Sequence, residues 1–356
     1  MDRPEAPASS EPTTTTPRPP WGGAAVVGLT LAVLQTWVVL TPDAVELDQE
    51  ELYNAAHAWE LLQGHFSELF VLQYRRFCGG CTLDALLGAA LFSILPPSFF
   101  TWKLVPMGFT VVLGVVGFLK LHRHLGATVA WAFAALLALP PQVWVIQSLV
   151  AWGNHYEAGA LAALGLLCLP PPSDRPHRAA CLGSGALLAL ALWTSFSATF
   201  AVVGIFIALA LQRRTTELQW WCGGLALVLV PWALQGLTTG TLPFGTIYEA
   251  GYATPDPTRI PSKIATLLAP QQLAAMFGLR HAWLGLCLAT GWLVGLGTAL
   301  YGLRRSPLLA RQATGLAGLW GVIYLVVAFQ VHVPDWPLVA DAGALRYVAP
   351  LYPVLF

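Results

Sequence analysis

Residues 23–42 read GAAVVGLTLAVLQTWVVLTP and contain no charged side chain. An α-helix needs about 20 largely apolar residues to cross the hydrocarbon core of a bilayer. Further runs of this kind follow along the 356-residue chain, in which 56% of residues are hydrophobic and the mean hydropathy is +0.63. Only 10% of residues are charged, against about 25% in a soluble domain. The sequence therefore predicts an all-α, polytopic helical membrane protein and excludes a soluble globular domain.

The apolar runs predict about 10 transmembrane helices. After residues 23–42, the predicted spans are 101–121, 127–148, 154–170, a hairpin of two short spans within 180–211, 218–236, 282–302, 313–331 and a last one that begins near Arg346. A helix cannot end in hydrocarbon with unpaired carbonyls, so we expect either that the chain is C-terminally incomplete at Phe356 or that its last helix ends against other protein. The Pro-, Thr- and Ser-rich residues 1–21 predict a disordered tail, and residues 22–356 form the predicted transmembrane domain.

The distribution of charge predicts the orientation. The N-terminal tail and the basic links near residues 120, 175, 213 and 305 hold 11 of the 18 Lys and Arg residues but only 5 of the 18 acids. The positive-inside rule places these segments in the cytoplasm, which puts two long loops, 43–100 and 237–281, outside. The first of these loops contains two predicted helices, 49–63 and 82–95. The second helix is too short to cross comfortably, and we expect it in or along the interface.

The first outside loop opens with DQEELY, residues 48–53. Apolar positions then recur at helical spacing: Leu52, Ala55 or Ala56, Trp59 and Leu62. The helix can therefore lie flat on the membrane with Trp59 at headgroup depth. Asp48 stands at the helix N-terminus, where free N–H groups favour a carboxylate, and with Glu50 it is a candidate to deprotonate a hydroxyl beside a lipid-borne reactant. Alternatively, Asp48 is only an N-cap, and Glu50 and Glu51 are first-turn acids.

A second acidic feature is GNHYE, residues 153–157, at the outside turn before the fourth predicted span. Ionisable groups at membrane depth are costly, so His155 and Glu157 are functional candidates. The alternative is a polar turn that caps the span. His155 and Glu157 do not share a helical face, which makes them a poor zinc motif.

Several basic residues lie on the outside, although the basic excess is cytoplasmic. Arg75, Arg259, Lys263 and Arg346 belong to this set, and the planar donor fork of Arg suits a phosphate group. The alternative for each is an ordinary solvated loop charge. Cys78 and Cys81 form an outside C-x-x-C, for which a local disulfide or two free thiols are the simplest interpretations.

Taken together, these features resemble the C-type (GT-C) integral-membrane glycosyltransferases, and within them the protein mannosyltransferase and lipid A aminoarabinose transferase group. The resemblance is a pattern over nearly the whole chain. Its parts are the acid and amphipathic helix after the first span (Asp48, Glu50, Tyr53, Ala56, Leu62 and Gly64), a span opened by Lys103 and Pro106, the acid Glu157, and a late R-Y-x-x-P-x-x-P (Arg346, Tyr347, Pro350 and Pro353).

The resemblance implies transfer of a sugar from a polyprenyl-phosphate donor to an acceptor on the non-cytoplasmic side of a bacterial inner membrane. Asp48 would be the catalytic base, with Glu50 and Glu157 orienting hydroxyl groups. The residues implied to bind the phosphate and the substrate are Arg75, Arg259, Lys263, Arg346, His155 and Tyr347. The expected partners are the donor lipid and the membrane, not nucleic acid. No cofactor is required, although a divalent metal bridging Asp48 and Glu157 is compatible with the pattern.

Two other classes of protein also fit a polytopic chain with polar residues among its spans. One is a transporter or lipid flippase, which should place ionisable groups near the middle of the bilayer. The other is an inactive, GT-C-like structural protein. Clustering of the acids at one membrane surface favours the enzyme over the transporter.

Overall fold

A computed structural model describes residues 20–239, except 43, 46–47, 67–72, 75–76, 79–81, 141, 154, 171–176 and 196–197, and a few residues between 269 and 290. The predicted N-terminal tail, most of the outside loop 237–281 and the spans predicted beyond residue 290 lie outside the described residues, as does Phe356.

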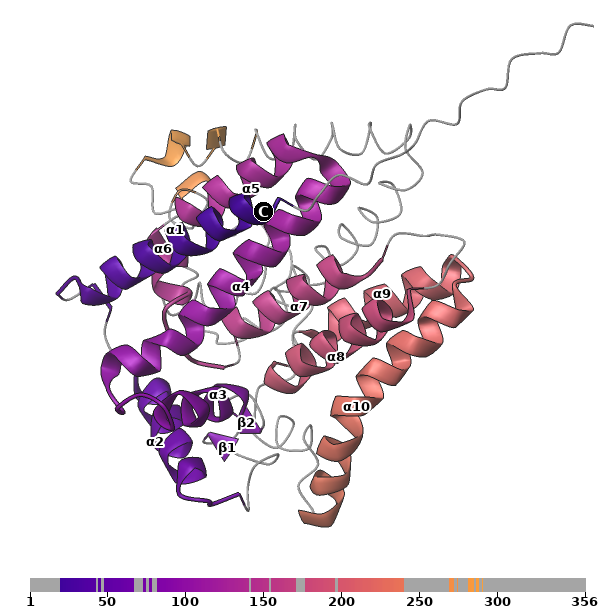
Figure 1. The fold of residues 1–356 in the computed structure, drawn as a ribbon, viewed down its shortest axis with the longest axis horizontal. Coiled ribbons are helices and arrows are strands. Elements are labelled where there is room, and N and C mark those ends of the chain that lie inside the picture. Colours follow the sequence, from indigo (N-terminus) through magenta and orange to yellow (C-terminus); the bar gives the residue numbers. More distant parts are fainter. Residues whose placement is uncertain are drawn as a thin grey trace, which may run out of the picture.

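The described part of the chain is helical, with one short antiparallel strand pair in addition (Figure 1). In chain order the elements are α1 (Trp21–Leu40), α2 (Gln49–Leu62), β1 (Gln73–Tyr74), β2 (Phe77–Cys78), α3 (Thr82–Phe92), α4 (Phe99–Leu125), α5 (Ala127–Ala138), α6 (Gln142–Gln147), α7 (Tyr156–Cys168), α8 (Arg178–Thr194), α9 (Thr199–Leu211) and α10 (Thr215–Thr239). In the strand pair, Tyr74 lies opposite Phe77.

Three of the described helices are long and apolar enough to cross a membrane: α1, α4 and residues 215–238 of α10. Shorter apolar helices accompany them, namely α3, α5, α7, α8 and most of α9. This confirms the prediction of a helical, membrane-associated protein. The predicted hairpin within 180–211 corresponds to α8 and α9, with the turn after Thr194.

The structure differs from the prediction at residues 127–148, which were expected to form one span. They form two helices, α5 and α6, that are separated at Leu139. Pro140 and Pro141 follow directly. A proline lacks the N–H that a helix interior needs and disfavours helical geometry in the residue before it. The chain therefore leaves α5 early and reaches α7 through the short helix α6 and an irregular segment.

Helix α4 is the central element of the bundle. It packs against α1, α5 and α7, while α8 packs against α7 and α10. Helices α2 and α3 pack against each other and lie with the strand pair at one end of the bundle (Figure 1). Lys103 is near the start of α4, so this end of α4 is the one next to α2 and α3.

Helix α2 presents its polar side to the protein and its apolar side outward. Glu51, Asn54 and His57 are buried, together with Ala58 and Leu61. The predicted apolar stripe lies on the opposite, exposed side of the helix, where 52% of Leu52 and 46% of Trp59 is accessible. An exposed apolar stripe is what a helix that lies on a membrane surface requires.

Helices α8 and α10 cross closely at glycines. A Cβ added at Gly185 would collide with the Trp221 carbonyl oxygen and lie 3.1 Å from the Leu225 nitrogen. One added at Gly183 would meet nothing within 4 Å. Small residues at such crossings let helix backbones approach closely in membrane proteins.

We therefore expect Gly185→Ala to destabilise the protein by roughly 1–3 kcal/mol, the usual cost of overpacking. Gly183→Ala is the matched control, because it gains helix propensity without a collision. Thermal unfolding in detergent measures both variants. Equal midpoints for Gly185→Ala and Gly183→Ala would contradict the tight crossing.

Candidate functional site

Asp48 caps helix α2. The Glu50 N–H donates a hydrogen bond to Asp48 Oδ1 at 2.8 Å, and the Asp48 N–H donates to Glu51 Oε2 at 3.3 Å, which completes a capping box. The alternative role predicted for Asp48, that of an N-cap, is thus present in the structure. Asp48 is also exposed, while Glu50 is half-buried. Capping therefore leaves the Asp48 carboxylate open to a reactant.

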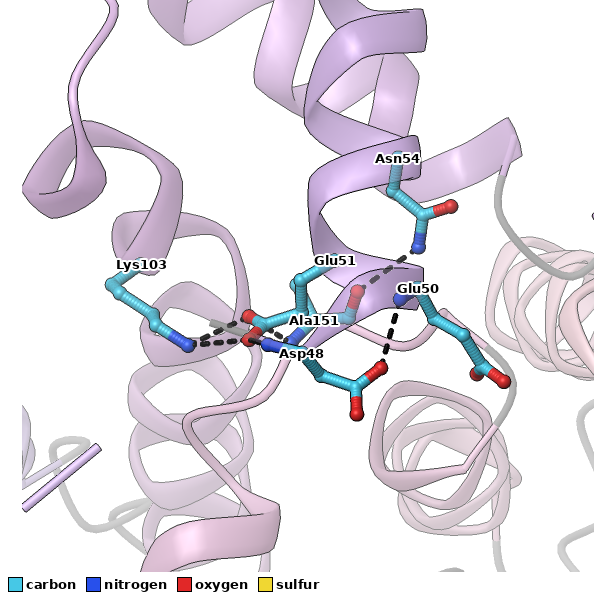
Figure 2. A network of polar contacts seen from close by, with 6 residues as sticks. All are labelled: Asp48, Glu50, Glu51, Asn54, Lys103 and Ala151. Atoms are coloured by element: carbon cyan, nitrogen blue, oxygen red, sulfur yellow. Dashed lines mark hydrogen bonds and ion pairs between the residues drawn. The ribbon is translucent and has the colours of Figure 1, made fainter. Parts of the chain in front are cut away.

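Glu51 and Lys103 form a buried ion pair between α2 and α4 (Figure 2). Lys103 Nζ lies 2.7 Å from Glu51 Oε1 and 2.8 Å from Oε2, and both side chains are 0% exposed. The Ala151 N–H donates a further bond to Glu51 Oε1 at 2.8 Å. A buried ion pair needs such additional hydrogen bonds to offset the cost of leaving water.

Asn54, one helical turn after Glu51, binds the other polar group of Ala151. Its Nδ2 donates to the Ala151 carbonyl oxygen at 3.0 Å (Figure 2). Two side chains on one face of α2 thus hold both the N–H and the C=O of a single residue in the turn before α7. These contacts join α2 to Ala151, two residues before the GNHYE segment, and Ala151 is 100 positions after Glu51.

Two further acids are fully buried at this end of the bundle, Asp84 of α3 and Glu157 in the first turn of α7. Among the described residues, none of their four carboxyl oxygens has a hydrogen-bond partner of ordinary geometry. The two carboxyl groups are nevertheless near enough to influence each other's ionisation, and the Gly153 N–H lies close to both at a looser approach than a standard hydrogen bond. Glu51 acts electrostatically on both acids.

The buried set thus combines three carboxyl groups with one ammonium group, and Lys103 is bound directly to only one of the three. Lys103 also interacts at longer range with Glu157 and with Asp48. The acids of α2 and α3 and the acid in the first turn of α7 therefore belong to one electrostatic unit. Such clusters of perturbed acids are typical of functional sites.

Burial raises the pKa of the Asp84 carboxyl from its usual 3.8 to about 8, and the negative charge of Glu51 adds to the rise. Asp84 is therefore largely protonated near neutral pH. A carboxylic acid in this range can both donate and accept a proton at physiological pH.

This shift predicts how stability depends on pH. The folded protein binds the Asp84 proton more tightly than the unfolded chain does. The contribution of this proton to the free energy of unfolding is therefore fully present below about pH 4 and is lost as the pH rises to about 8. We expect Asp84→Asn to flatten this decline, measured as unfolding midpoints from pH 5 to pH 9. Glu60→Gln, on the exposed side of α2, is the control. A decline as steep in Asp84→Asn as in the wild type would show that Asp84 is not its source.

The structure describes four of the predicted site residues: Asp48, Glu50, His155 and Glu157. His155 is buried, and its ring meets the Trp152 ring edge-on at a centroid distance of 5.5 Å. The predicted binding residues Arg75, Arg259, Lys263, Arg346 and Tyr347 lie outside the described residues. Within the described ranges, no three His, Cys, Asp or Glu side chains are grouped closely enough to hold a metal ion, and the divalent metal stays a prediction.

Asp84 was not among the site residues predicted from the sequence, and Glu51 was predicted only as a first-turn acid. A signal for Asp84 was present, because it is the one acid in the otherwise apolar helix TLDALLGAALF. No spacing rule identifies the pairing of Glu51 with Lys103, since 52 positions separate them.

Comparison with known proteins adds no assignment: no protein-family model, no curated protein and no solved structure matches this chain. The described fold and site define the class only as a helical membrane protein with a buried acidic cluster at one end of its bundle.

Proposed function

We propose that this protein transfers a sugar from a polyprenyl-phosphate-linked donor to an acceptor on the non-cytoplasmic side of the membrane. The observation that supports this best is the meeting of acids from two distant segments, seen in the bond from the Ala151 N–H to Glu51 and in the approach of Asp84 to Glu157. The proposal includes about ten spans, a cytoplasmic N-terminus and a bacterial inner membrane, as the charge pattern and the GT-C resemblance imply.

In the proposed reaction, the acceptor oxygen forms a bond to the anomeric carbon while the bond from that carbon to the donor phosphate oxygen breaks. The acceptor proton passes to the Asp48 carboxylate, and the departing polyprenyl phosphate takes the bonding electron pair. The exposure of Asp48 and its place beside the membrane-facing stripe of α2 suit this role. Lys103 is already paired with Glu51. In this proposal, the negative charge that develops on the donor phosphate is therefore stabilised by the predicted outside cations Arg75, Arg259, Lys263 and Arg346.

The position of the cluster along α4 favours an enzyme over a transporter. Lys103 is four residues after Phe99, the first residue of α4, which is roughly 6 Å along the helix axis. A site for transport across the membrane should lie near the middle of the span. The cluster instead lies near one end of α4, next to helix α2 with its exposed apolar stripe.

Purified protein in lipid nanodiscs, incubated with a panel of labelled polyprenyl-phosphate sugars, tests the proposal. Labelled sugar that is transferred to an acceptor or released by hydrolysis supports it. Intact donor, together with movement of the labelled lipid between leaflets after reconstitution in vesicles, would instead identify a flippase. Intact donor without such movement would point to a structural protein.

A further inference from the structure

The segment between α6 and α7 is not helical, so its backbone N–H and C=O groups need hydrogen-bond partners other than those of a regular helix. It runs from Ser148 to His155, and Gly153 adopts a φ of 75°, which favours glycine. Buried backbone groups that lack helical partners are normally satisfied by side chains. The side chains that bind the backbone of this segment therefore help to fix the position of the start of α7.

Helix α2 supplies the first attachment, because Glu51 and Asn54 bind the two polar groups of Ala151 at 2.8 Å and 3.0 Å. Both side chains are fully buried. Both hydrogen bonds to Ala151 are therefore shielded from solvent.

Helices α1 and α4 supply the second attachment at the two ends of the segment. Gln35 Nε2 of α1 donates to Thr110 Oγ1 at 3.0 Å and to Ser148 Oγ at 3.3 Å. Thr110 Oγ1 of α4 lies 2.6 Å from the Tyr156 hydroxyl oxygen. Tyr156 is the residue directly before Glu157, so α1 and α4 fix the chain on both sides of Ala151.

We propose that Asn54 and Thr110 are positioning residues, which hold the turn 148–155 so that Glu157 stands beside Asp84, without themselves contacting substrate. The observation behind this is that their hydrogen bonds end on Ala151 and Tyr156 and extend from helices α2 and α4. Only the kinetic consequence of this inference rests on the proposed glycosyl transfer. Groups held on rigid helices in this way keep a site within the tolerances that catalysis needs.

The charges around the acid pair make the inference testable. Among the described residues, Glu51 of α2 acts on both Asp84 and Glu157, while Lys103 of α4 and the Tyr156 hydroxyl of α7 act on Glu157. Asn54 and Thr110 are neutral. Asn54→Ala and Thr110→Val therefore change no charge, and any change in the titration of the acid pair reports a change in position.

Infrared difference spectroscopy of the protonated carboxyl band measures that titration, with Asp84→Asn and Glu157→Gln used to assign the band. Two acids that interact strongly lose their protons in steps separated by more than about one pH unit. We expect this separation to narrow in Asn54→Ala and in Thr110→Val, because Glu157 can move away from Asp84. Thr110→Ser retains the hydroxyl and should restore the wild-type separation.

Ser184→Ala is the matched control. Ser184 Oγ is fully buried and donates to the Gly165 carbonyl oxygen at 2.7 Å, which joins α8 to α7 well beyond its first turn. This variant should lose stability like the others but leave the titration unchanged. If Asn54→Ala and Thr110→Val behave like Ser184→Ala, their roles are structural and the inference is overturned.

If the wild type transfers sugar, steady-state kinetics provide a second test of the same variants. Displacement of a reacting group by about 1 Å can cost about 10²-fold in rate. We expect Asn54→Ala and Thr110→Val to lower kcat by about 10- to 100-fold with little change in KM. A rise in KM at constant kcat would contradict the positioning role. Narrowed titration steps in a protein without transfer activity would uphold the positioning and refute the proposed function.

Discussion

Lys103→Met is expected to lower the free energy of unfolding by about 3–5 kcal/mol, the usual cost of removing one partner of a buried ion pair. The variant would leave the Glu51 carboxylate fully buried, with the Ala151 and Asp48 N–H groups as its remaining donors among the described residues. Glu157 and Asp48 would also lose the interaction with the Lys103 ammonium group. Chemical denaturation of the purified protein in detergent micelles measures the change.

The double variant Glu51→Gln/Lys103→Met separates the contribution of the ion pair to stability from that of side-chain packing. The Gln side-chain oxygen can still accept the hydrogen bond from Ala151, and no unpaired charge remains on Glu51. Replacing both members of a buried ion pair is often close to neutral, whereas removing one member is not. We therefore expect the double variant to be more stable than Lys103→Met alone.

Lys120→Met is the control for the loss of a lysine from α4, since Lys120 lies near the other end of the same helix and is only partly buried. It should change stability by less than about 0.5 kcal/mol. If the effects of Glu51→Gln and Lys103→Met were simply additive, the two residues would not be energetically coupled, and the ion pair would not hold α2 to α4.

Helix α2 illustrates what local sequence predicts well. Its start at Asp48 followed three residues later by Glu51 is a capping-box pattern, and the observed bounds Gln49–Leu62 agree with the predicted 49–63. The break between α5 and α6 was missed for a local reason. The apolar residues on both sides of Pro140 suggested one continuous span, although the two prolines signalled an interruption.

The candidate site depends on relations that local patterns do not contain. The apolar stripe of α2 predicts a side that faces the membrane, but it does not say what the opposite, polar side contacts. That side carries Glu51 and Asn54, whose partners come from α4 and from the turn before α7. Because these contacts arise only when distant helices pack, the sequence could single out Asp48 and Glu157 as candidates but could not assemble the cluster.

Asp48→Asn is expected to reduce sugar transfer by about 10²–10⁴-fold, the contribution that general-base catalysis typically makes. The substitution isolates chemistry from folding. Asn caps a helix as well as Asp does, and its side-chain oxygen can still accept the hydrogen bond from the Glu50 N–H. Helix α2 and membrane insertion should therefore be unchanged, which circular dichroism and membrane fractionation can verify.

Two further variants locate the effect within α2. Glu60→Gln removes a carboxylate that is 61% exposed and pairs only with His57 at 3.3 Å, so it should leave transfer unaffected. Glu50→Gln removes the half-buried acid next to the cap and should lower kcat less than Asp48→Asn if Glu50 only orients a hydroxyl group. Normal turnover in Asp48→Asn, combined with a large loss in Glu50→Gln, would move the base from the capping carboxylate to its neighbour. The proton would then leave the acceptor toward the first turn of α2 rather than toward its N-cap.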